Sequence, residues 1–228
     1  MKLAIMQPYL FPYLGYFQLI HAVDAFVVYD DVNFIKGGWI NRNYILGGNG
    51  KQLITLPLKS ASQNKLINDI EVGERQKILK TLRHNYSKAP HFDDVFPIIE
   101  KIMLQAQTNL AAFLDNQLSQ VCHYLGLSPQ WHLSSNLRKD NQLRGQDKIL
   151  AICTELGATH YINPPSGIVL YDRAAFEGHD LKLSFIQPRP VRYRQFSPDF
   201  VPNLSIIDVL MFKSREDCSK LLGKYDLV

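Results

Sequence analysis

The sequence predicts an α/β fold whose mixed sheet opens with a β-loop-α-β unit and which contains a central helical segment. Two apolar runs of strand type, 2–6 and 26–29, enclose a stretch whose apolar residues recur at helical spacing. Further along, two amphipathic stretches each stop at a glycine, Gly126 and Gly157. Because strands and helices alternate in this way, we expect a packed α/β domain.

Each further element follows from its own pattern. The glycines of 47–50 join two strand-like segments and supply the positive φ angles that a tight hairpin needs. The remaining expected elements are strands at 43–46, 52–57, 67–72, 160–163 and 181–186, and helices at 74–85, 110–125, 149–156, 205–210 and 215–222. We expect one domain over residues 1–228, with a helical subdomain at about 74–156 as the alternative.

Composition restricts the class of protein. The chain has 228 residues, of which 46% are hydrophobic, and its 25 Lys and Arg against 21 Asp and Glu give a net charge of +4. The charges are scattered, so a nucleic-acid partner is not expected, whereas an anionic small molecule is compatible with them. No apolar run approaches the ~18 residues of a membrane span, so we expect a cytoplasmic protein without membrane insertion. Nothing in the sequence indicates an oligomeric state.

Cysteine and histidine usage gives no sign of a metal site. Cys122, Cys153 and Cys218 each lie in an apolar helical pattern, so buried thiols are expected. The seven histidines lack metal-ligand spacing, and HExxH, P-loop and GxGxxG motifs are absent. We therefore expect neither a metal nor a bound cofactor.

An aromatic loop at 7–17 precedes the first helix. Two prolines stiffen it, and it leads into a helix N-terminus, whose free N–H groups suit phosphate or carboxylate. Its candidate substrate-binding residues are Gln7, Tyr9, Tyr13 and Tyr16. The alternative is a structural connection whose aromatic side chains enter the core.

A polar loop follows the second strand. Within fourteen residues it gathers two carboxylates, two cations, asparagine amides and an indole. A carboxylate can act as general base toward an amine, and cations can hold a diphosphate or an oxyanion. The catalytic candidates are Asp30, Asp31, Lys36 and Asn43, and the substrate-binding candidates are Trp39, Asn41 and Arg42. The alternative is a solvated loop with surface ion pairs.

Two later segments also contain candidates for substrate binding. Ser166, Gly167 and Tyr171 follow a predicted strand, where glycine allows close approach of a ligand, and a plain turn is the alternative. Tyr193 lies in the Pro- and Arg-rich segment 187–202. Just beyond it, Ser205 and Asp208 match the Ser-x-x-acid pattern of a helix cap.

Four long motifs carry a family resemblance. They read IMQPYLFPYLGYFQLI, DAFVVYDDVNFIKGGWINRNYI, THYINPPSG with Tyr171, and QPRPVRYRQFSPDFVPNLSIIDVL, and they extend over 5–210. On these motifs the chain resembles the WbqC-like family of bacterial proteins, commonly encoded among surface-polysaccharide and O-antigen genes. It departs from the family pattern at Met6, where members often have histidine, and at Phe11-Pro12-Tyr13, where Leu-Pro-Trp is frequent.

The resemblance implies transfer of an aminoacyl or acyl group, often suggested to be glycine, to the amine of a nucleotide-linked amino sugar such as a dTDP-amino hexose. The implied donor is a CoA or carrier-protein thioester, with an acyl carrier protein as a partner. Asp30 or Asp31 would orient or deprotonate the amine. Main-chain N–H groups at the first helix start, or Lys36 and Asn43, would stabilise the oxyanion, and Trp39, Arg42 and Tyr193 would hold the nucleotide.

Two other functions remain open at the level of sequence. The first loop is similar in outline to the HxGH loop of nucleotidylyltransferases, with Tyr13 and Tyr16 in place of its histidines, so nucleotidyl or adenylyl transfer is one alternative. A non-catalytic nucleotide-sugar binding component is the other. A covalent route through Cys153 has little support, because an apolar environment raises the pKa of a thiol.

Overall fold

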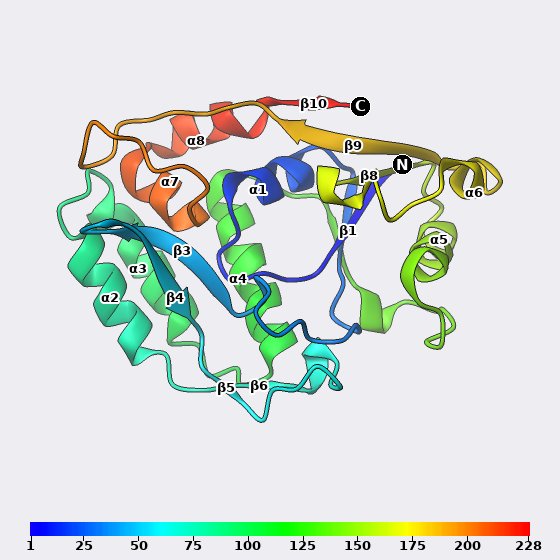
Figure 1. Ribbon diagram of the computed structural model, residues 1–228, viewed down its shortest axis with the longest axis horizontal. Helices are drawn as coiled ribbons and strands as arrows, with labels where there is room; N and C mark the ends of the chain where they lie inside the picture. Colours follow the sequence, from blue (N-terminus) through cyan, green and yellow to red (C-terminus); the bar gives the residue numbers. More distant parts are fainter.

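The computed structural model describes residues 1–228, and its centre is a six-stranded sheet in the order β10-β9-β8-β1-β2-β7. The strands are β1 (Lys2–Met6), β2 (Ala25–Val28), β7 (Gln130–Leu133), β8 (His160–Asn163), β9 (Lys182–Pro188) and β10 (Tyr225–Leu227). Five are mutually parallel and β10 pairs antiparallel with β9. This mixed sheet confirms the predicted fold class (Figure 1).

Helices cover both faces of the sheet. All four residues of β2 are buried, as in parallel strands that are covered on both sides. Phe26 and Val28 belong to a core cluster of 49 residues that includes α1 (Leu14–His21) and α4 (Leu110–Leu125). Ala25 and Val27 belong to a cluster of 13 residues with α5 (Gly145–Glu155) and α6 (Arg173–Glu177). The alternation of side chains along the strand thus divides the core into two layers.

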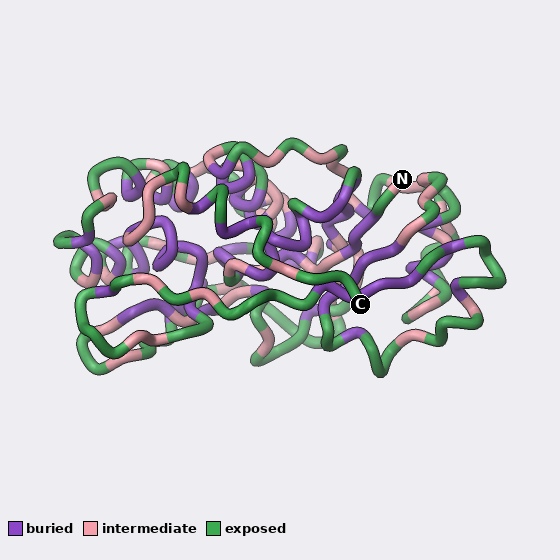
Figure 2. Tube along the Cα trace, turned by 90° about the horizontal axis from the view of Figure 1, so that it is seen from above, coloured by how far each residue is buried: buried purple, intermediate pink, exposed green.

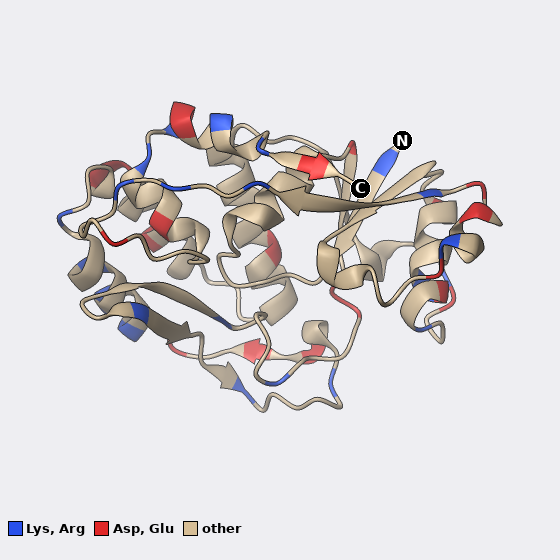
Figure 3. Cartoon of the chain, turned by 45° about the horizontal axis from the view of Figure 1, so that its top comes forward, with Lys and Arg blue, Asp and Glu red and all other residues tan.

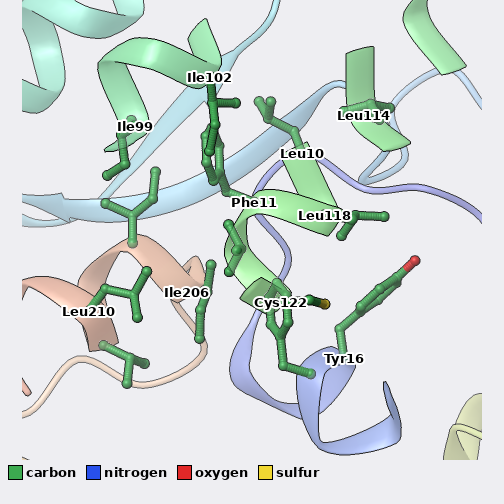
Figure 4. Packing of buried hydrophobic residues seen from close by; sticks show 14 of the residues in the cluster. Leu10, Phe11, Tyr16, Ile99, Ile102, Leu114, Leu118, Cys122, Ile206 and Leu210 are labelled. Carbon is green, nitrogen blue, oxygen red and sulfur yellow. The ribbon is translucent and has the colours of Figure 1, made fainter. Parts of the chain in front are cut away.

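The larger cluster extends beyond the sheet. It includes residues of α2 (Gln76–Tyr86), α3 (Phe92–Met103), α7 (Ile206–Phe212), α8 (Arg215–Leu222) and the hairpin of β3 (Arg42–Gly47) and β4 (Gly50–Thr55). Leu10 and Phe11 of the first loop point into it, among Ile102 of α3, Leu118 of α4 and Ile206 of α7 (Figure 4). Buried segments run through both halves of the molecule, with exposed residues along the outer loops (Figure 2).

Most predicted elements are confirmed, including the hairpin and the helix ends at Gly126 and Gly157, whose φ angles are +76° and +63°. The predicted strand at 67–72 is confirmed only at its end: a 3-10 turn at Ile67–Asp69 precedes the two-residue strand β6 (Glu71–Val72), which pairs with β5 (Leu58–Lys59). The turn forms because the N–H groups of Ile67 and Asn68 donate to the carbonyls of Val32 and Asp30.

Further observations complete the comparison with the sequence. No counterpart among the predicted elements exists for the helices α3 and α6 or the strands β5, β7 and β10. The three cysteines are free and buried, as expected. The helices α2 to α4 lie in the larger cluster and α5 in the smaller, while the subdomain boundary at about 74–156 stays a prediction. None of the helices combines the length and apolar character that crossing a membrane requires.

Candidate functional site

The order of the strands marks one edge of the sheet as a ligand site. From β1 the chain adds β2 and β7 on one side, then crosses over to add β8 and β9 on the other. In doubly wound sheets of this kind, ligands bind outside the carboxyl ends of the strands, where the strand order reverses. Here that point lies between the ends of β1 and β8, which are Met6 and Asn163.

A buried ionic group lies at this edge beside the end of β2. The Oδ2 atom of Asp31 lies 2.9 Å from Nζ of Lys139 and 3.1 Å from Nζ of Lys148. The side chains of both lysines are almost fully buried, and that of Asp31 is 9% exposed. Lys148 also donates to the main-chain carbonyl of Asp31 at 2.8 Å. Two buried cations therefore share a single carboxylate.

Burial and hydrogen bonding act in opposite directions on Asp31. Burial raises the pKa of its carboxyl group, but the nearby Ser134 side chain and the ammonium groups of Lys139 and Lys148 outweigh this and leave the pKa below its usual value. Asp31 is consequently ionised at neutral pH.

Asp30 has different partners. Its Oδ1 accepts from the main-chain N–H of Ser135 at 2.9 Å, and its Oδ2 accepts from the hydroxyl of Ser135 at 2.6 Å. Asp30 is 3% exposed, and no lysine or arginine forms an ion pair with it. Its carboxylate is therefore held by neutral donors, whereas the carboxylate of Asp31 is held mainly by ammonium groups.

Aromatic and amide side chains extend the ionic group toward β8. Lys148 lies 5.3 Å from the centre of the Tyr29 ring, and the pKa of Tyr29 is raised by burial and by the charges of Asp31 and Tyr171. Asn163 donates to the hydroxyl of Tyr161 at 2.6 Å, and this hydroxyl lies 3.5 Å from that of Tyr171. We call the set Tyr29, Asp31, Lys139, Lys148, Tyr161, Asn163 and Tyr171 the carboxyl-edge cluster.

Gly167 is fitted tightly against this cluster. A Cβ atom at Gly167 would lie 2.2 Å from Oδ1 of Asn163 and 3.0 Å from the ring of Tyr171. Glycine is the residue that allows this close approach. The structure thus brings together three of the predicted site residues, Asp31, Gly167 and Tyr171, while Ser166 beside them is exposed.

Two other predicted residues meet at a cavity of about 440 Å³ next to the start of α1. Tyr13 lies on one wall and Tyr193 on another, together with Arg189 and Arg192. We call it the α1 cavity. It lies in the common size range of small-molecule sites and shares no residue with the carboxyl-edge cluster.

The remaining residues of the first loop are turned toward the protein. Tyr16 is 1% exposed and donates its hydroxyl to the carbonyl of Gln7 at 2.9 Å. The Tyr9 ring lies 5.7 Å from that of Tyr16, and burial raises the pKa of Tyr9 to about 12. Asn43 is buried and donates to the carbonyls of Leu10 and Phe11. These two hydrogen bonds stabilise the backbone at Phe11, whose φ of +40° is unusual for a residue other than glycine. The catalytic role of Asn43 stays a prediction.

The loop after β2 forms a third group. Arg42 lies 5.9 Å from the centre of the Trp39 ring and donates to the carbonyls of Gly37 and Gly38. Trp39 is 42% exposed, Asn41 donates to the carbonyl of Leu56, and Lys36 is exposed without an ion pair. The two cations of this loop therefore lie outside the carboxyl-edge cluster.

Sequence reasoning did not identify the most buried cations of the chain. Lys148 lies in the first turn of α5, where a lysine beside the apolar Ile149 and Leu150 could have been read as a residue turned inward. Lys139 lies in a polar segment and gave no such signal. Basic and acidic residues are otherwise spread over the molecule, as the composition indicated (Figure 3). No group of three or more His, Cys, Asp or Glu side chains is placed to hold a metal ion.

The cap predicted at the start of α7 is half correct. Ser205 accepts from the N–H of Ile207 and so caps the helix. Asp208 instead accepts hydrogen bonds from Tyr86, Tyr193 and Gln195, without a cation. It therefore fixes Tyr193 at the wall of the α1 cavity.

Comparison with known proteins gives two matches. Residues 7–220 match the model of the WbqC-like protein family. The chain is also 31% identical, over 215 residues, to the Uncharacterized protein Rv1507c of Mycobacterium tuberculosis, and the alignment covers 92% of each protein. No solved structure matches the chain.

Proposed function

The chain belongs to the WbqC-like protein family, and we propose that it transfers an aminoacyl or acyl group to the amine of a nucleotide-linked amino sugar in bacterial surface-polysaccharide biosynthesis. The observation that carries the proposal is the carboxyl-edge cluster, where two buried lysines share one carboxylate beside the end of β2, on the sheet edge where the strand order reverses. The two ammonium groups can donate hydrogen bonds to the diphosphate of a nucleotide sugar, at the edge where doubly wound sheets bind nucleotides.

The proposed reaction uses the two carboxylates differently. The sugar amine attacks the carbonyl carbon of a CoA or carrier-protein thioester, a C–N bond forms, and the C–S bond breaks with release of a thiolate. The amine loses one proton, and this proton ends on the released thiolate after passing through a carboxylate. Asp30 is the better acceptor, because its partners are neutral, whereas ammonium groups lower the pKa of Asp31.

The experiment is a transfer assay with defined substrates. The protein is incubated with a dTDP-amino hexose and an acyl-CoA or glycyl-CoA, and released thiol and acylated sugar are measured together. We expect Asp30→Asn to lower kcat by 10²-fold or more, the usual contribution of a general base. Asp69→Asn, at an exposed carboxylate without an ion pair, serves as the matched control. Binding of the sugar without turnover across the donors would contradict catalysis and favour a binding component.

One observation favours nucleotidyl transfer as the second candidate. Counting the parallel strands in chain order, the sheet runs 5-4-1-2-3, an arrangement typical of nucleotide-binding doubly wound folds. Fold alone is weak support for a reaction, because one fold hosts many chemistries. This candidate requires magnesium-dependent consumption of ATP or another NTP with release of pyrophosphate, and absence of both would remove it.

A further inference from the structure

The charges of the α1 cavity favour an anionic ligand. Its lining includes Arg189 and Arg192 and no aspartate or glutamate. Arg189 forms a bidentate ion pair with Asp226 of β10. Arg192 is exposed and has neither an ion pair nor a hydrogen bond to the protein. One guanidinium group is therefore free to bind a ligand at the cavity.

The cavity also meets the N-terminus of α1. Tyr13 is the N-cap residue, and no side chain accepts a hydrogen bond from the first turn of the helix. Leu14 and Gly15 of this turn lie in the cavity wall. The uncapped N–H groups and the helix dipole attract a phosphate or carboxylate at this position. The helix end and Arg192 thus favour the same sign of charge.

Gln18 gives an independent sign of a ligand. It lines the cavity, is 1% exposed, and donates its amide Nε2 to the carbonyls of Leu221 and Lys224 at 2.9 and 3.1 Å. These two acceptors fix the orientation of the amide and leave Oε1 buried without a hydrogen-bond partner. A buried oxygen of this kind normally has a donor. A ligand that offers an N–H group would supply it.

Aromatic rings form walls of the cavity and are held in place. Tyr13 packs over Gly15, where a Cβ atom would lie 2.6 Å from the Tyr13 ring. Tyr193 donates to Asp208 at 2.7 Å and meets Phe200 edge to face at 5.0 Å. Such preformed aromatic walls suit a flat or extended neutral group.

We infer that the α1 cavity binds an organic phosphate, with the phosphate at the start of α1 beside Arg192 and a neutral part that donates an N–H group to Oε1 of Gln18. Two kinds of molecule share this chemistry: a nucleoside phosphate, whose base carries N–H groups, and a phosphopantetheine, whose amides do. The cavity is a second site, separate from the carboxyl-edge cluster, and binding alone tests it.

Isothermal calorimetry on the full chain tests this inference. The probes are dTDP, ADP and 4′-phosphopantetheine, with inorganic phosphate for comparison. We expect one of the first three to bind more tightly than inorganic phosphate. Arg192→Gln should weaken this binding about tenfold or more, since it removes a charged donor. Arg194→Gln is the matched control, because Arg194 is also exposed and unpaired but does not line the cavity.

Two further variants locate the bound probe. Tyr13→Ala removes a partly exposed ring from the cavity wall and should weaken binding while leaving the thermal unfolding temperature nearly unchanged. Lys148→Met lies in the carboxyl-edge cluster, to which the proposed function assigns the nucleotide sugar, and should leave binding of 4′-phosphopantetheine unchanged. Absence of binding by all three organic phosphates, equal effects of Arg192→Gln and Arg194→Gln on binding, or binding of 4′-phosphopantetheine that depends on Lys148 and not on Arg192 would each overturn the inference. None of these results depends on whether acyl transfer occurs.

Discussion

Lys148 bonds to both the side chain and the main chain of Asp31: its Nζ lies 3.1 Å from the carboxylate and 2.8 Å from the carbonyl oxygen. Lys148 belongs to the first turn of α5, and Asp31 follows the end of β2. Lys139, from the segment between β7 and α5, binds the same carboxylate. These contacts join the end of β2 to the stretch between β7 and the first turn of α5, which is distant from it in sequence, at the carboxyl edge of the sheet.

Removing the charge of Asp31 should strongly destabilise the fold. Asp31→Asn would leave two buried ammonium groups without a carboxylate, and breaking a buried ion pair in this way costs about 3–5 kcal/mol. Urea unfolding at pH 7 measures the loss. Lys220→Gln is the control, because its pairs with Glu216 and Asp217 are exposed to solvent and contribute little to stability. Similar small losses in both variants would contradict the buried ionic group.

The stability of the protein should depend on pH through two buried carboxyl groups, whose effects on stability have opposite signs. The pKa of Asp31 is below its usual value, so the unfolded chain binds the proton first and the contribution of Asp31 is lost as the pH falls below about 4. The pKa of Asp208 is raised by burial, so protonation stabilises the folded state as the pH falls toward 4.

Urea unfolding from pH 7 to pH 2.5 tests both signs. The stability difference between the wild type and Asp31→Asn should shrink at the acid end of this range. Between pH 7 and 4, the wild type should instead gain stability relative to Asp208→Asn. A constant difference for either variant would show that the carboxyl group has the same pKa in the folded and unfolded chain.

A methyl group at Gly167 should disturb the carboxyl-edge cluster. In Gly167→Ala the new Cβ would lie 2.2 Å from Oδ1 of Asn163, so Asn163 must move and its hydrogen bond to Tyr161 is strained. Overpacking of this kind costs about 1–3 kcal/mol. Gly48→Ala is the matched control, because nothing lies within 4 Å of a Cβ there. Equal stability of the two variants would contradict the close approach.

The three thiols should be unreactive in the folded protein. Burial raises the pKa of Cys122, Cys153 and Cys218 to about 12, so almost no thiolate is present at pH 8. Mass spectrometry should show no alkylation by iodoacetamide in buffer and three modifications in urea. Rapid modification of Cys153 in the folded state, with loss of activity, would revive a covalent mechanism.

The sequence predicted the elements whose signals are local. The helix end at Gly126 and the hairpin at 47–50 depend on backbone angles that glycine supplies, so they were predictable. The short strand β7 was not, because it is only partly buried and forms by pairing with β2, far away in the chain. The fold of 67–72 likewise depends on carbonyls of Asp30 and Val32.

The candidate site was predicted only in part, for the same reason. Asp31, Gly167 and Tyr171 stood out by residue type and by their place after a strand. The packing of α5 decides whether Asp31 faces the amine of a substrate or pairs with two lysine side chains, and spacing in the sequence does not reveal this packing. Asn43 donates to the carbonyls of Leu10 and Phe11, a contact between distant segments that its place in the motif does not reveal either.

Binding of a nucleotide-linked amino sugar to the carboxyl-edge cluster tests the account most directly. Thermal unfolding with and without a dTDP-amino hexose is compared for the wild type and Lys148→Met, which still leaves Asp31 paired with Lys139. At about 100 times its dissociation constant, the sugar should add about 2.7 kcal/mol to the stability of the wild type and far less to that of the variant. An equal gain in both proteins, or a gain only with magnesium and ATP, would contradict the account.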